Sequence, residues 1–167
     1  AVSDTLEQIP IRGGAMRARI LRPTGPPARA ALLVAGVHPD GINDPRLIDL
    51  ARELAAAGVI VVTPEIADLI NYRVTSRATD SIEDALLWMQ RRPDLFGAAD
   101  VGVIGVSFSG GLATVAAGRP QVPDRIAYVL SFGGHGNLPR VLRYLCTGLE
   151  PAAAGAPGRP RPPHDYA

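Results

Sequence analysis

Apolar and polar positions follow two patterns along this chain. Near its start, residues 6–11 and 16–21 alternate between apolar and polar around Gly13 and Gly14, which is typical of a β-hairpin with a glycine turn. Later runs are short and continuously apolar, as expected of strands buried on both faces of a sheet. These runs cover residues 30–35, 59–63 and 101–105, and we expect a final strand over 126–132.

Helical periodicity fills the intervals between these strands. The first helix starts with Asp44 as its N-cap and Pro45 at the first helical position, and Gly58 ends it. Its buried face is Leu47, Leu50, Ala51 and Leu54, and the stripe of the second helix is Ile82, Ala85, Leu86 and Met89. A third helical pattern follows the strand at 101–105 as far as Gly118, and a fourth covers 138–149.

This order of elements predicts the fold class. A hairpin followed by strand–helix units predicts an α/β fold: a mostly parallel sheet with an N-terminal antiparallel hairpin, right-handed crossovers and helices on both faces. We expect a core over residues 1–137 and a separate helix over 138–149. Residues 150–167 are rich in Pro, Gly and Ala and are expected to be a loop or a disordered tail.

Composition narrows the class of partner. The net charge of +1 over 167 residues argues against nucleic acid or an anionic membrane surface, and no apolar run is long enough to cross a bilayer. The one cysteine, Cys146, lies among leucines of the last predicted helix, where we expect a packed core thiol.

No His, Cys, Asp or Glu residues have metal-ligand spacing, so we expect no metal and no cofactor. The chain starts without Met and closes after a proline cluster, so we expect further sequence at both ends.

The stretch around residue 107 carries the chemistry. A buried strand, a sharp turn and a helix with a serine at the apex expose a hydroxyl at the top of a parallel sheet. The turn is strained, so the residues two before and two after the serine must be small; for Ser107 these are Gly105 and Ser109. A shifted register would make Ser109 the nucleophile, with Phe108 ending the strand. A third interpretation is a glycine-rich strand-to-helix turn without chemistry, although the glycine spacing does not fit a dinucleotide-binding fingerprint.

The segment Gly105-Val106-Ser107-Phe108-Ser109 resembles the nucleophile elbow of the α/β-hydrolase family, whose usual pattern is G-x-S-x-G. Here serine replaces the second glycine. The order of elements over residues 6–132 is similar to the first part of that fold as well. The resemblance implies the N-terminal portion of a serine hydrolase such as an esterase, a lipase or a dienelactone-hydrolase-like enzyme.

The resemblance also implies partners for the serine. A serine hydroxyl needs a base, and the family supplies a histidine oriented by an acid, in the order Ser, acid, His. The sequence stops before both positions, so we expect the acid and the histidine beyond its end and an inactive fragment without them. His38 lies in the loop that builds the oxyanion hole, and His135 and Ser109 are expected to line the pocket. His164 beside Asp165 is not expected to serve, because neighbouring residues of extended chain point apart.

The oxyanion hole has one donor that follows from position, the backbone N–H of Phe108 at the head of the elbow helix. The second is expected from the loop at residues 36–41, where Val37, His38 and Asp40 remain open and Pro39 has no N–H.

These expectations together predict a serine hydrolase that acts on an ester or related acyl bond of a small molecule. Two alternatives stay open. One is a non-catalytic hydrolase-like binding domain, supported by the replaced glycine and the missing triad partners. The other is an acyltransferase, whose elbow would look the same. In the hydrolase, the helix at 138–149 would begin a cap over the site.

Overall fold

The computed structural model describes residues 1–25, 27, 29–97, 100–122, 125–150, 152 and 156–163. It divides the chain into two compact units, Ala1–Gly134 and His135–Ala167.

Within the described residues, the first unit is built on a six-stranded sheet in the order β1-β2-β4-β3-β5-β6. The strands are β1 (Val2–Ile11), β2 (Gly14–Pro23), β3 (Arg29–Val34), β4 (Val59–Pro64), β5 (Val101–Val106) and β6 (Ile126–Phe132). β2 pairs antiparallel with both β1 and β4, whereas β3 pairs in parallel with β4 and β5, and β5 with β6. The predicted fold class, a mostly parallel sheet with an antiparallel N-terminal hairpin, is confirmed.

The hairpin shows why two glycines stand at its turn. Ile11 pairs with Gly14 at the tip, and Gly13 has a φ of 80°. This left-handed conformation costs glycine little because it has no Cβ. Each hairpin strand is ten residues long. Both strands are longer than the alternating segments at 6–11 and 16–21, because the backbone pairing of β1 with β2 continues beyond those residues.

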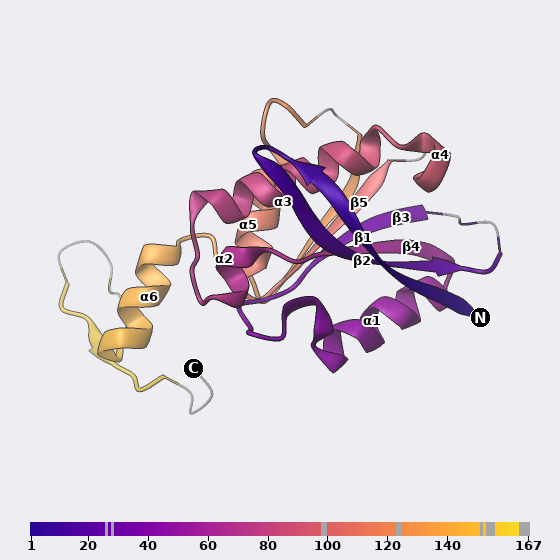
Figure 1. Ribbon diagram of the computed structural model, residues 1–167. Coiled ribbons are helices and arrows are strands. Elements are labelled where there is room, and N and C mark those ends of the chain that lie inside the picture. Colours follow the sequence, from indigo (N-terminus) through magenta and orange to yellow (C-terminus); the bar gives the residue numbers. More distant parts are fainter. Residues whose placement is uncertain are drawn as a thin grey trace. The chain divides into compact units, whose positions relative to one another are not determined.

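Helices cover both faces of the sheet, as predicted. The helical elements of the first unit are η1 (Gly41–Asn43, a 3-10 turn), α1 (Pro45–Ala56), α2 (Ala67–Ile70), α3 (Ser76–Gln90), α4 (Pro93–Phe96) and α5 (Phe108–Ala117). Figure 1 shows α1 on one side of the sheet, and α3 and α5 on the other. The predicted stripes of α1 and α3 are the faces that pack on the strands, except that Leu50 of α1 is exposed.

The core therefore has two parts, one on each face. The larger part joins α3 and α5 to the sheet and contains Trp88, whose ring meets that of Phe96 edge-on at 5.2 Å between centroids. The smaller part lies beneath α1 and includes Leu33, Val61 and Ile104. Burial of these apolar side chains is the main stabilising contribution to the unit.

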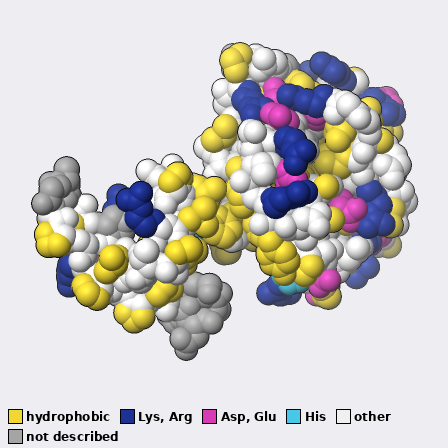
Figure 2. Space-filling view, turned by 60° about the vertical axis from the view of Figure 1, so that its left-hand side comes forward, with side chains coloured by type: hydrophobic (Ala, Val, Ile, Leu, Met, Phe, Trp, Pro, Cys, Tyr) yellow, Lys and Arg dark blue, Asp and Glu magenta, His cyan; other side chains and the backbone are white. Residues whose placement is uncertain are grey.

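Charged side chains tie the hairpin tip to the helical layer. Glu83 of α3 is buried, with 2% of its side chain exposed, and it pairs with Arg12 at 2.7 Å and with Arg119 at 2.6 Å. Arg12 also pairs with Asp84 at 2.8 Å. The buried carboxylate is thus satisfied by two guanidinium groups, as a buried charge requires. Elsewhere on the larger unit, Figure 2 shows basic and acidic side chains interleaved.

The second unit is small and is built around α6 (Leu138–Thr147). Two short strands, β7 (Leu149–Glu150) and β8 (Arg159–Pro160), pair antiparallel and include residues of the segment that is expected to be a loop or a disordered tail. The prediction of a packed thiol at Cys146 is wrong, because the side chain is exposed and α6 buries none of its residues. The predicted helix is present, but among the described residues no second layer buries its apolar face.

Strand β6 is the edge of the main sheet. It pairs with β5 on one side, and no strand of the described residues pairs with its other side. Apolar side chains in its second half are exposed, with 48% of Leu130 and 71% of Phe132 accessible to solvent. An open apolar edge of this kind is a site of self-association.

We therefore expect Phe132→Lys to reduce the self-association of the 167-residue chain, because a charge at the edge opposes pairing with another strand. Sedimentation velocity over a range of concentrations measures the effect. Val115→Lys is the matched control, since Val115 is an exposed apolar residue of α5 with 58% accessibility. Equal self-association of wild type and the Phe132 variant would show that the edge does not drive it.

Asp44 is the N-cap of α1, as predicted. The interactions of its carboxylate make the stability of the protein depend on pH. The carboxylate accepts hydrogen bonds from the backbone N–H of Arg46 at 2.9 Å and from the Arg46 guanidinium at 2.8 Å. The side-chain hydrogen bond from Arg46 is the largest cause that lowers the pKa of Asp44 from 3.8 to about 2. The folded pKa is thus below the unfolded one, so this stability is present above about pH 4 and is lost as the pH falls through 2.

Asp44→Asn keeps a capping oxygen but removes the charge. We expect it to lower the free energy of unfolding by about 1–2 kcal/mol at pH 7 and to leave it nearly unchanged at pH 2. Urea unfolding at both pH values measures the difference. Asp49→Asn, which removes an exposed carboxylate of the same helix, should show no such pH dependence. A constant difference for Asp44→Asn would mean that the charge is not responsible.

Candidate active site

Ser107 occupies the corner between β5 and α5. Its φ and ψ are 56° and −133°, a conformation that residues other than glycine rarely adopt, and the residue is exposed. Its N–H donates to the Phe132 carbonyl at 2.7 Å, and its own carbonyl accepts from the Gly110 N–H at 2.9 Å. The surrounding strand and helix therefore hold the strained residue, which costs about 1–3 kcal/mol, and keep its side chain at the carboxyl end of the sheet.

Glycines make this corner possible. A Cβ added to Gly105 would overlap the Ser109 carbonyl and lie 2.7 Å from the Gly110 Cα. A Cβ added to Gly110 would lie 2.8 Å from the Gly134 Cα. Distances below 3.0 Å essentially never occur for real Cβ atoms. Glycine at 105 therefore lets β5 approach the first turn of α5, and glycine at 110 lets α5 approach the segment after β6.

Ser109 differs from Ser107 although only one residue separates them. Ser109 is completely buried, and its hydroxyl donates to the carbonyl of Ala35, the residue directly after β3. One serine of the elbow is thus open to solvent, and the other has its hydroxyl engaged inside the protein.

The loop after β3 runs against the elbow. A Cβ added to Gly36 would lie 3.3 Å from the Ser107 Cβ and 3.4 Å from the Val106 carbonyl oxygen. At the other end of the loop, Gly41 has a φ of 49°, and a Cβ there would lie 2.6 Å from the Cγ2 of Ile70. Both ends of the loop are therefore held close to their neighbours, one by the elbow and one by α2.

Hydrogen bonds within this loop distinguish its N–H groups. The Asp40 N–H donates to Nδ1 of His38 at 3.3 Å, and the Gly41 N–H donates to the His38 carbonyl at 3.1 Å. By contrast, the N–H groups of Val37 and His38 meet no acceptor in the described part of the chain. The Nδ1 of His38 also lies 3.7 Å from a carboxylate oxygen of Asp44. Because Nδ1 accepts a hydrogen bond, neutral His38 carries its proton on Nε2.

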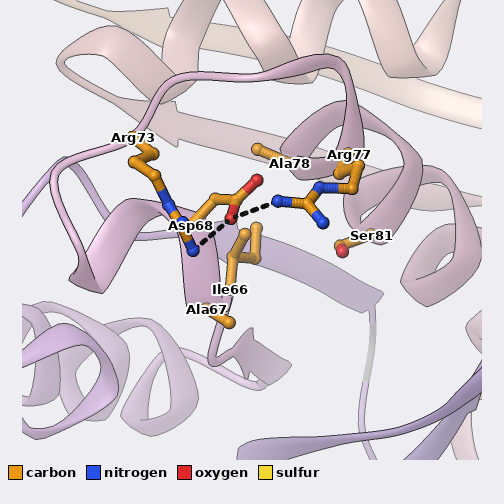
Figure 3. Close-up of a pocket in the computed structure, with 7 residues that line it drawn as sticks. All are labelled: Ile66, Ala67, Asp68, Arg73, Arg77, Ala78 and Ser81. Carbon is orange, nitrogen blue, oxygen red and sulfur yellow. Dashed lines mark hydrogen bonds and ion pairs between the residues drawn. The ribbon is translucent and has the colours of Figure 1, made fainter.

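A cavity of about 260 Å³ lies where α2 meets the start of α3. Figure 3 shows the guanidinium groups of Arg73 and Arg77 turned toward the carboxylate of Asp68 between them, at 3.0 and 3.4 Å. The hydroxyl of Thr75 donates to the same carboxylate, and this bond is the largest cause that lowers the Asp68 pKa. The cluster fastens the segment after β4 to α3. Sequence reasoning missed it, since its spacing matches no helical or strand period.

His135 belongs to the second unit, whereas Ser107, Phe108, Ser109 and the loop at 36–41 all belong to the first. His164 lies outside the described residues. Among the described residues, no group of three or more His, Cys, Asp or Glu side chains could hold a metal ion. In that same part of the chain, no helix combines the length and apolar character that a membrane span needs.

Several solved structures have a fold similar to that of this chain. The dienelactone hydrolase from Anabaena variabilis matches with a TM-score of 0.61 and 20% identity, over 76% of this chain and 62% of that one. Brefeldin A esterase, a bacterial homologue of human hormone-sensitive lipase, matches with a TM-score of 0.60 and 21% identity, over 75% of this chain and 38% of that one. A hyperthermophilic esterase from the archaeon Pyrobaculum calidifontis matches with a TM-score of 0.53 and 26% identity, over 70% and 39%.

At the level of sequence, no family model matches, and no curated protein matches. The chain spans less than two thirds of the length of each of these three structures. The similarity therefore concerns the fold alone. The fold of this chain is that of the α/β-hydrolases.

Proposed function

We propose that this chain is the N-terminal part of a serine hydrolase that cleaves an ester or related acyl bond, with Ser107 as its nucleophile. The observation that carries the proposal is the exposed Ser107 with a φ of 56° between β5 and α5. Strain of this kind at an exposed hydroxyl is typical of a functional corner. The names of the similar structures, dienelactone hydrolases and esterases, support acyl chemistry.

The two serines of the elbow are not equivalent candidates. Ser109 is buried, and its hydroxyl donates to a backbone carbonyl. An attack by Ser109 would have to break that bond and bring the substrate below the surface. Burial thus supports the register with Ser107 at the apex.

The oxyanion hole is proposed to combine the Phe108 N–H with one donor from the loop at 36–41. Phe108 is the first residue of α5, where the helix dipole favours negative charge. In the loop, the Asp40 N–H already donates to His38. This supports Val37 or His38 as the second donor over Asp40.

The proposed reaction proceeds in two stages. The Ser107 Oγ attacks the acyl carbon while a base takes its proton, and the oxyanion is held by the two N–H groups. Collapse breaks the bond to the leaving alcohol, which receives the proton, and water then releases the acid from the acyl-serine. The histidine and acid of the triad are proposed to follow residue 167. The greater length of the similar structures supports this, and the 167-residue chain alone is proposed to be inactive.

Active-site labelling tests this proposal. In the complete polypeptide, we expect a fluorophosphonate to attach to Ser107, as mapped by peptide mass spectrometry, and Ser107→Ala to abolish the label. Ser76→Ala is the matched control, because Ser76 is an exposed serine at the start of α3.

Two outcomes would contradict the proposal. A label on Ser109 would overturn the register. A complete polypeptide that takes up no label would overturn the nucleophile and favour a non-catalytic binding domain. Product analysis with an ester and a second alcohol separates hydrolysis from acyl transfer.

A further inference from the structure

The Ser109 hydroxyl connects two parts of the site that are 74 residues apart in the sequence. Ser109 is the second residue of α5, directly after Phe108. Its acceptor, the carbonyl of Ala35, directly precedes Gly36 and the loop at 36–41. The bond therefore joins the head of the elbow helix to the beginning of the loop.

The acceptor is placed where it can orient that loop. The carbonyl of Ala35 and the N–H of Gly36 belong to one peptide group, which is planar and rigid. Holding the carbonyl oxygen fixes the orientation of this plane, and with it the direction in which the chain leaves β3. Gly36 lies so close to the elbow that an added Cβ would be 3.3 Å from the Ser107 Cβ. A change in this direction would therefore move the loop relative to Ser107.

We propose that Ser109 is a positioning residue, which holds the loop at 36–41 so that its oxyanion donor and the Phe108 N–H face the same atom. This rests on the function proposed above. A glycine at position 109, as in the usual G-x-S-x-G pattern, has no hydroxyl to make the bond. The hydroxyl is thus a departure of this chain from that pattern, and its contribution acts through the loop and not on the substrate.

The competing explanation is that Ser109 only fills space in the core. Two variants distinguish the explanations: Ser109→Ala removes the hydroxyl, whereas Ser109→Cys keeps a side chain of similar size with a weak donor. Thr63→Val is the matched control. Thr63 is also buried, and its hydroxyl donates to the Arg19 carbonyl at 3.3 Å, but it lies in β4.

Amide hydrogen exchange of the 167-residue chain is the first measurement. We expect both Ser109 variants to raise exchange about five- to tenfold in residues 36–41 and to leave strands β3 and β5 unchanged, as the loss of one hydrogen bond implies. Thr63→Val should leave residues 36–41 as in wild type. A Ser109→Cys variant that matches wild type, or a uniform rise over the whole unit, would overturn the proposal in favour of packing.

The rate of phosphonylation at Ser107 in the complete polypeptide is the second measurement. We expect both Ser109 variants to react about 100-fold more slowly, because a misplaced donor loses transition-state stabilisation, and Thr63→Val to react at the wild-type rate. A faster-exchanging loop with an unchanged rate would overturn the positioning role. If wild type takes up no label, the proposed function fails, and the exchange measurement still decides whether Ser109 holds the loop.

Discussion

The close approach of β5 and α5 is the constraint on which the rest of this site depends. The strand enters the corner at Gly105 and the helix leaves it past Gly110, and neither position has space for a Cβ. This contact forces Ser107 into a left-handed backbone conformation and turns its side chain out of the protein. The strained residue is held by its hydrogen bonds to the carbonyl of Phe132 on the neighbouring strand and from the N–H of Gly110 in the first turn of the helix. The hydroxyl is therefore presented by a rigid support and not by a flexible loop.

The topology of the sheet brings the other parts to the same edge. β3 and β5 are adjacent and parallel, so the loop after β3 and the elbow after β5 begin side by side at the carboxyl end of the sheet. β4 is parallel to β3, and the segment after β4 therefore starts at that edge as well, where Asp68 and its two arginines fasten it to α3. Crossover helices on both faces leave this edge as the place where chain segments far apart in sequence can meet.

Local patterns explain why much of this was predictable. The glycine turn of the hairpin, the Asp44 cap of α1 and the spacing of Gly105 and Ser107 each depend on a few neighbouring residues, and the sequence contains them all. The hydrogen bond from Ser109 to Ala35 and the ion-pair cluster at Asp68 depend on how distant elements pack together. The spacing of residues within one helix or strand does not predict such contacts. Cys146 shows the same limit of local patterns. The amphipathic pattern of its helix predicts an apolar face, but it does not tell whether another part of the protein covers that face.

The replaced glycine of the elbow has a different meaning once its surroundings are known. In the sequence, Ser109 counted in favour of a non-catalytic domain, since the usual pattern has glycine there. In the structure, the side chain is completely buried and its hydroxyl has an acceptor, so the substitution introduces neither a clash nor an unsatisfied polar group. The departure from the pattern is therefore compatible with the geometry of the elbow, and it adds a contact to the loop that is proposed to supply an oxyanion donor.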